Sequence, residues 1–137
     1  MSLDEFERYK NNTYLSPITP EVLAAMGTRC GFPPASNVLD LACGKGETGI
    51  IFAEKFHCIV TGAESRPVFA EEARRRALFR SLNHLIHILD QDSGELPFDD
   101  DFYDAALMAG TAHPYDSGSV LAELNRVVRP EGWIILG

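Results

Sequence analysis

The hydrophobic residues of this 137-residue chain form short, nearly continuous runs, and longer stretches of mixed polarity separate them. The runs lie at residues 38–42, 58–63, 85–89, 103–108 and 133–136. Continuous apolar runs of this length are typical of strands that are buried on both faces of a parallel sheet. Apolar residues at helical spacing fill most of the intervals between the runs, so the pattern predicts an α/β fold.

The helix predicted at residues 66–81 shows the helical spacing most clearly. One face carries the apolar side chains, which are Phe69, Ala70, Ala73, Ala77 and Leu78. Arginines and glutamates share the rest of the helix within single turns. We interpret them as a mixed-charge, solvent-exposed face and not as a nucleic-acid surface.

Start and stop signals place the remaining helices. A helix over residues 48–55 follows the first apolar run. Thr19 as a cap, followed by Pro20, begins an earlier helix in a leading segment. The last helix begins at Asp116 or Ser117, and a proline and a glycine before the final run end it.

The stretch from Asn37 to Gly49, NVLDLACGKGETG, combines a buried strand, a glycine-rich turn and the start of a helix. Backbone N–H groups and the positive end of the helix would point beyond the end of the strand, which makes this a ligand site. The spacing Gly44-x-Gly46-x-x-Gly49 also satisfies the dinucleotide pattern GxGxxG, with Glu64 at the end of the next strand. The glycines alone therefore leave two ligand classes open.

Two carboxylates help to separate these ligand classes. Asp40 ends the strand and Glu47 opens the helix, so a pyrophosphate would lie among like charges. A ligand with an ammonium and a carboxylate fits better, because Asp40 would face the ammonium while the glycine N–H groups receive the carboxylate. S-adenosylmethionine carries both groups.

Four segments of the chain form an ordered set of motifs. They read VLDLACGKGETG at 38–49, VTGAES at 60–65, Asp92 followed by LPF at 96–98 and FYD at 102–104, and LNRVVRPEGWIIL at 124–136. Together they resemble the motifs of class I S-adenosylmethionine-dependent methyltransferases. The resemblance implies a three-layer, doubly wound Rossmann-like sheet of about five parallel strands in the order 3-2-1-4-5. The family's last two strands are missing from this chain.

The resemblance also assigns cofactor contacts. It gives Glu64 the two ribose hydroxyls, and an acid that caps a helix starting at Ser65 is the alternative. It places Asp92 against the exocyclic amine of adenine and the N–H of Ser93 at a ring nitrogen, with Asp90 as the competing acid. The full set of expected cofactor contacts is Asp40, Ala42, Gly44, Gly46, Glu64, Ser65, Asp92, Ser93 and Ala109.

Residues 109–116 follow the fourth strand, where an enzyme of this family meets its methyl acceptor. They lack an N-P-P-Y or D-P-P-Y sequence, which disfavours methylation of nucleic-acid amino groups. His113 is the candidate general base, because an unperturbed histidine has a pKa near 6.5; a histidine that lines the rim without chemistry is the alternative. We expect a small-molecule acceptor, in-line displacement and no metal, since correct placement supplies most of what methyl transfer needs.

Composition, charge and length limit the possible partners, location and domain organisation of the protein. The formal net charge of −8 disfavours unaided nucleic-acid binding, and no apolar stretch is long enough to span a membrane. Three cysteines without metal-type spacing and an acidic first segment predict a reducing, cytoplasmic location. The length fits a single domain, 1–137, with a leading helical segment at 1–35 and a Rossmann-like core at 36–137.

Three functional hypotheses remain open at this point. The first is methyl transfer from S-adenosylmethionine to a small molecule. The second is a non-catalytic or truncated S-adenosylmethionine-binding domain that needs a partner. The third is an NAD-dependent oxidoreductase. The fifth strand would be an apolar sheet edge, which a homodimer could cover, and Asp104, at the start of the fourth strand, should be structural.

Overall fold

The computed structural model describes residues 18–91, 95–108 and 117–136. Its elements are α2 (Pro20–Cys30), β1 (Asn37–Leu41), α3 (Glu47–Phe56), β2 (Ile59–Glu64), α4 (Pro67–Phe79), β3 (Ile86–Asp90), β4 (Tyr103–Met108), α5 (Ser117–Val127) and β5 (Val128–Leu136). Most boundaries lie within two residues of the predicted ones, and the alternation of strands and helices is the predicted one.

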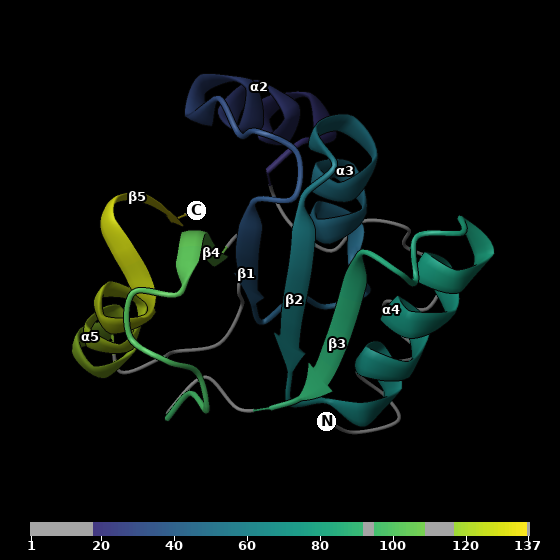
Figure 1. Ribbon diagram of the computed structural model, residues 1–137. Helices are drawn as coiled ribbons and strands as arrows, with labels where there is room; N and C mark the ends of the chain where they lie inside the picture. The colour runs from purple at the N-terminus through teal and green to yellow at the C-terminus, as the bar shows by residue number, and fades with distance from the viewer. Residues whose placement is uncertain (1–17, 92–94, 109–116, 137) are drawn as a thin grey trace.

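The five strands form one parallel sheet in the order β3-β2-β1-β4-β5, which confirms the predicted topology. The strand β1 lies in the middle, where Val38 pairs with Val60 of β2 and with Ala105 of β4. All strands point their carboxyl ends in the same direction, and the arrowheads of β1, β2 and β3 lie toward the bottom of Figure 1. Ligands bind at this edge in doubly wound sheets.

Two hydrophobic cores lie on opposite faces of the sheet. Helices α3 and α4 cover one face, with α2 packed against α3, and α5 covers the other (Figure 1). Alternate residues of β1 serve the two cores, because Val38 belongs to the first cluster and Leu39 and Leu41 to the second. This arrangement is the predicted three-layer fold and explains why β1 is apolar throughout most of its length.

The leading helix α2 begins where its sequence predicts. The Thr19 hydroxyl accepts a hydrogen bond from the N–H of Val22 at 3.3 Å, and Pro20 occupies the first turn. Gly31 follows the helix in the left-handed conformation, with φ of 65°.

Charged side chains on α4 pair with one another, as predicted. Arg75 and Arg76 both contact Glu72, at 2.7 and 3.0 Å. Arg74 reaches Asp90 of β3, and Arg80 reaches Glu54 of α3. The arginines are therefore engaged within a mixed-charge surface.

The predicted apolar face of α4 was wrong at one position. Phe69, Ala70, Ala73 and Ala77 are buried, but Leu78 is 63% exposed. It lies about 100° around the helix from Ala77, outside the stripe that faces the sheet.

The last strand starts earlier than predicted. The strand β5 follows α5 directly at Val128, and its pairing with β4 is irregular between Tyr103 and Ala105. The intervening residues are accommodated by Glu131 in the left-handed conformation and by Gly132, where a Cβ atom would lie 2.5 Å from Val128 Cγ1. The proline and glycine thus form an irregularity within the strand and do not delay its start.

Asp104 has the structural role that was predicted. Its Oδ2 atom accepts a hydrogen bond from the N–H of Asn37 at 2.7 Å, and its Oδ1 atom accepts one from Arg129 at 2.8 Å. These bonds join the amino ends of β1, β4 and β5, at the edge opposite the glycine-rich turn.

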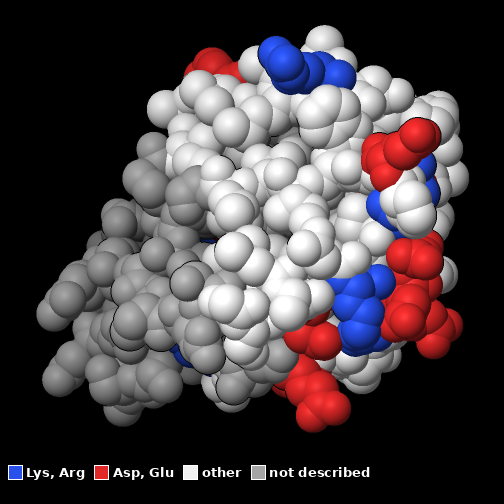
Figure 2. All heavy atoms as spheres, turned by 90° about the vertical axis from the view of Figure 1, so that its left-hand side faces the viewer, with Lys and Arg blue, Asp and Glu red and all other residues white. Residues whose placement is uncertain are grey.

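Among the described residues, the centre of the outer side of β5 and α5 carries few charges (Figure 2). Figure 2 shows that uncharged residues make up most of its central area, while acidic and basic side chains gather toward the border. Trp133 and Leu136 of β5 are 39% and 49% exposed. Within the described ranges, no helix combines the length and apolar character needed to cross a membrane.

Candidate functional site

The turn after β1 has a backbone that few residue types adopt. Ala42, Gly44 and Gly46 have φ values of 55°, 59° and 83°, all in the left-handed region. Cys43 lies between the first two and donates its N–H to the carbonyl of Ala63 at 3.1 Å. This bond ties the turn to β2, so the end of β1, the turn and the end of β2 form one unit.

The second and third glycines allow close packing around this turn. A Cβ atom on Gly46 would lie 3.1 Å from the Cβ of Ala73, which belongs to α4. A Cβ atom on Gly49 would lie 3.1 Å from Cγ1 of Val60 in β2. The absence of side chains here brings the first turn of α3 against both neighbours and aims its amide groups at the carboxyl edge of the sheet.

Glu64, the last residue of β2, is 1% exposed and accepts four hydrogen bonds. Two come from the backbone, where Oε1 accepts from the N–H of Gly44 and Oε2 from the N–H of Arg66, each at 2.9 Å. The Arg66 guanidinium gives the other two, from Nε to Oε2 at 2.9 Å and from Nη2 to Oε1 at 3.0 Å. A carboxylate has about four acceptor positions, so those of Glu64 are filled.

These partners keep Glu64 ionised. Burial acts to raise its pKa, but the hydrogen bonds and charge of Arg66, with the Gly44 N–H, lower the pKa below its ordinary value. The carboxylate is therefore a fixed acceptor at the carboxyl edge of the sheet. The carboxylate also accepts from the Arg66 N–H at the start of α4. The helix-cap alternative is not met, because the N-cap residue of α4 is Arg66 and the helix starts at Pro67, not at Ser65.

Asp40 has the opposite electrostatic environment. It is 3% exposed, and within the described part of the chain its Oδ2 atom has no hydrogen-bond partner. Burial raises the pKa of Asp40 well above its ordinary value, the charges of Glu47 and Glu64 raise it further, and only the Gly49 N–H acts to lower it. A cationic group of a ligand would relieve this accumulation of acids.

The described residues fit a ligand of the type that the sequence predicts. Glu64 is an ionised acid held by backbone donors, which suits hydroxyl groups. Asp40 is a buried acid with an unpaired oxygen, which suits an ammonium. The left-handed turn between them exposes backbone to a ligand at close range.

The other predicted contacts divide into two groups. Ala42 lies in the turn and is partly buried, and Ser65 is exposed directly after Glu64. Asp92, Ser93, Ala109 and His113 lie outside the described residues. The competing acid Asp90 accepts a hydrogen bond from Arg74 at 2.8 Å.

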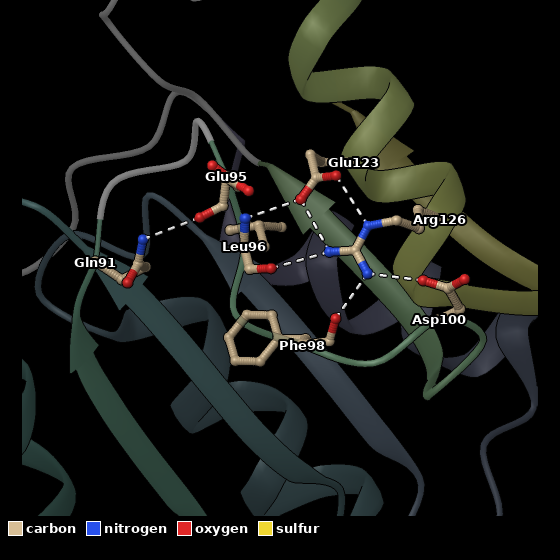
Figure 3. A network of polar contacts seen from close by, with 7 residues as sticks. All are labelled: Gln91, Glu95, Leu96, Phe98, Asp100, Glu123 and Arg126. Atoms are coloured by element: carbon tan, nitrogen blue, oxygen red, sulfur yellow. Dashed lines mark hydrogen bonds and ion pairs between the residues drawn. The ribbon is translucent and has the colours of Figure 1, made fainter.

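Sequence reasoning missed a polar network that fixes the LPF segment (Figure 3). The Arg126 guanidinium of α5 donates to the carbonyls of Leu96 and Phe98, at 2.9 and 2.7 Å, and to Asp100 Oδ1 at 2.8 Å. Glu123, one turn earlier, accepts from the N–H of Leu96 and from Arg126. The hydrogen bonds from Arg126 and from the Leu96 N–H lower the pKa of Glu123 to about 2.

This network connects α5 to the segment that follows the expected adenine-binding residues. The only signal in the sequence is a glutamate and an arginine three residues apart on a helix, which is common on exposed helices. Arg66 was also missed. Its partner Glu64 lies only two residues away, but the sequence does not show that the arginine side chain turns back to it.

Comparisons with known proteins agree with this geometry. The family described as a methyltransferase domain matches residues 38–132. A demethylmenaquinone methyltransferase from Clavibacter sepedonicus is 31% identical over 129 residues, which are 93% of this chain and 51% of that protein. A glycine/sarcosine/dimethylglycine N-methyltransferase from Actinopolyspora halophila is 29% identical over 113 residues, which are 80% of this chain and 20% of that protein.

Solved structures give the same result for the fold. The crystal structure of an S-adenosylmethionine-dependent methyltransferase from Geobacter sulfurreducens, in complex with S-adenosylhomocysteine, matches with a TM-score of 0.85 at 25% identity. The match covers 98% of this chain and 55% of that one. The chain thus spans between a fifth and about half of the proteins named here, and none of these matches supports the NAD-dependent alternative.

Proposed function

Because the chain belongs to the class I S-adenosylmethionine-dependent methyltransferases, we propose that it binds S-adenosylmethionine and transfers a methyl group to a small-molecule acceptor. The observation that carries this proposal is the pair of buried acids at one edge of the sheet. Glu64 is ionised and fixed by backbone donors, and Asp40 has an unpaired oxygen in the described part of the chain. A ribose and an ammonium on one ligand would satisfy both.

Each described residue has a specific binding role in this proposal. Glu64 accepts hydrogen bonds from the ribose hydroxyls, and Asp40 accepts from the ammonium. Ala42, Gly44 and Gly46 let the turn approach the ligand, while Ser65 borders the ribose. When bound, the cofactor supplies a methyl group on a sulfonium, which is already a good leaving group.

The residues outside the described ranges complete the proposal. Asp92 and Ser93 would hold the adenine, and Ala109 would border the cofactor at the end of β4. His113 would take a proton from the acceptor, which is an optional step because alignment of donor and acceptor at about 3–3.5 Å supplies most of the acceleration. A small-molecule acceptor is supported by the relatives, whose names refer to demethylmenaquinone and to glycine derivatives.

A cofactor-binding chain without its own transferase activity is the second candidate. It is favoured by the exposed apolar side chains of β5, Trp133 and Leu136, which a partner could cover. The outer side of β5 and α5 (Figure 2) would then receive a partner, and a homodimer is the simplest form of it. We also retain the predicted single-domain organisation and cytoplasmic location as parts of this proposal.

Calorimetric titration tests the proposed function directly. The chain should bind S-adenosylmethionine and S-adenosylhomocysteine with micromolar affinity, and NADH should give no heat of binding. Asp99→Asn, at an exposed acid outside the site, provides a control for the loss of one negative charge. Preferential binding of NADH, or absence of binding by both adenosyl ligands, would overturn the proposal.

Transfer is tested separately from binding. Incubation with methyl-labelled cofactor and panels of quinols and amino-acid amines should label an acceptor if the chain is an active enzyme. Cofactor binding without labelling of any acceptor would favour the non-catalytic alternative.

A further inference from the structure

Arg66 occupies a position where arginine is an unusual choice. It is the N-cap residue of α4, and its side chain makes no capping hydrogen bond. Serine, threonine, aspartate and asparagine are preferred at this position because their short side chains accept from the first amides of the helix. The guanidinium of Arg66 instead turns back to Glu64 and lies over the ring of Phe69, at 4.4 Å from its centroid.

The four hydrogen bonds to Glu64 are of two kinds. The N–H groups of Gly44 and Arg66 belong to the backbone, and each uses one acceptor position on one carboxylate oxygen. The fold fixes these two donors. One further position on each oxygen remains, and the Arg66 guanidinium fills both through Nε and Nη2.

A ribose presents the same donor pattern as this guanidinium. Its two neighbouring hydroxyls are two donors on adjacent atoms, and the guanidinium fork likewise presents two N–H donors to a carboxylate. Both groups cannot use the same two acceptor positions at once. We propose that Arg66 holds the ribose-binding positions of Glu64 in the free protein, so that the nucleoside binds only when its diol displaces the arginine side chain.

This inference rests on the proposed function and makes Arg66 a residue that limits how tightly the ribose position binds its ligand. A ligand with both ribose hydroxyls compensates Glu64 for the lost guanidinium. A ligand that lacks one hydroxyl leaves the ionised Glu64 carboxylate incompletely paired. Glu64 is 1% exposed in the free protein, so water cannot readily replace the missing donor. The Arg66 side chain, 17% exposed, has a path to solvent once it is released.

Substitution of Arg66 provides the test. Removing the competing guanidinium with Arg66→Ala should tighten binding of S-adenosylhomocysteine by about tenfold, the equivalent of one partly buried ion pair. Binding of the 2′-deoxyadenosyl analogue should tighten by a similar factor, because that ligand also no longer has to displace the guanidinium. Arg75→Ala is the matched control, since Arg75 lies on the same helix, is 65% exposed and pairs with Glu72.

A second variant covers the case in which Arg66→Ala does not fold. Arg66→Lys keeps the charge but cannot present two donors as a fork, so it should bind S-adenosylhomocysteine about threefold more tightly than the wild type. A spectroscopic measurement needs no variant. In nitrogen-15 NMR spectra, the Nε–H signal of Arg66 should shift on saturation with S-adenosylhomocysteine, and that of Arg75 should not.

The outcomes separate this inference from the function on which it rests. Equal or weaker binding of S-adenosylhomocysteine by both Arg66 variants, or an unchanged Arg66 Nε–H signal at saturation, overturns the displacement and leaves the proposed function intact. Absence of binding by the wild type and by both variants overturns the proposed function and the displacement together.

Discussion

Replacing Asp40 by asparagine should stabilise the free protein while weakening its cofactor site. Asp40 is 3% exposed, has one oxygen without a partner among the described residues, and shares its surroundings with Glu47 and Glu64. An unsatisfied buried polar group costs about 1–3 kcal/mol, and a charged one costs more. The asparagine side chain carries no charge, so the free energy of unfolding at pH 7 should rise by about 1–3 kcal/mol.

The sign of the pH dependence follows from the direction of the pKa shift. Burial, then Glu47 and Glu64, raise the folded-state pKa of Asp40 well above its unfolded value. The folded state therefore binds the proton more tightly, and wild-type stability falls as pH rises from about 3.9, the unfolded pKa, through the raised folded pKa. The Asp40→Asn variant lacks this decline, so its advantage should be largest at neutral pH and should vanish near pH 4.

Urea denaturation between pH 4 and pH 8 measures this difference, with Asp99→Asn as the exposed-acid control. The same Asp40→Asn variant should bind S-adenosylhomocysteine at least about tenfold more weakly, because a charge-assisted hydrogen bond to the ammonium contributes about 1.5–3 kcal/mol. A variant that is less stable than the wild type at pH 7, or an advantage that does not depend on pH, would refute the reasoning.

Three further substitutions test other parts of the site. Glu64→Ala should weaken S-adenosylhomocysteine binding by about 1–3 kcal/mol through lost charged hydrogen bonds, and unchanged affinity in calorimetry would remove Glu64 from the site. Gly62→Ala should lower the unfolding free energy by about 1–3 kcal/mol, because its Cβ would lie 2.7 Å from Ile88 Cδ1; an unchanged urea midpoint would contradict this. Glu123→Gln should speed hydrogen exchange at the Leu96 amide, which donates to Glu123 at 2.8 Å. The variant should also lose less stability than the wild type as pH falls from 4.5 toward 2. Identical acid unfolding curves for the variant and the wild type would count against a stabilising role of the Glu123 carboxylate.

Much of the fold could be predicted because its determinants are local. The apolar run of β1, its glycine-rich turn and the amphipathic pattern of α4 each read directly as an element. The strand order came from the resemblance and was confirmed by the pairing of β1 with both β2 and β4. The role of Asp104 followed from its place at the start of a strand, far from the carboxyl edge.

Two errors concern α4 and the start of that helix. The prediction put Leu78 on the apolar face, but helical spacing turns it about 100° away from Ala77, and it is exposed. The helix-cap alternative started α4 at Ser65, whereas Arg66 takes the cap position and pairs with Glu64. No local pattern shows that four donors would converge on one carboxylate.

The start of β5 was also predicted incorrectly, because it depends on the neighbouring strand. Pro130 and Gly132 are usual stop signals, so the strand was predicted only after them. In the structure β5 starts at Val128 and absorbs both residues in its irregular pairing with β4. A neighbouring strand can thus override a local preference.

The central position of β1 has a consequence for how the protein folds. Asn37 of β1 bonds to Asp104 at the start of β4, and the two residues are 67 positions apart in the sequence. During synthesis β1 can pair with β2 early, but its other edge stays open until β4 has left the ribosome. Contacts of such high sequence separation slow folding, and an open apolar edge is prone to association. The strand that forms the middle of the finished sheet is therefore the segment most exposed to misassembly while the chain is still incomplete.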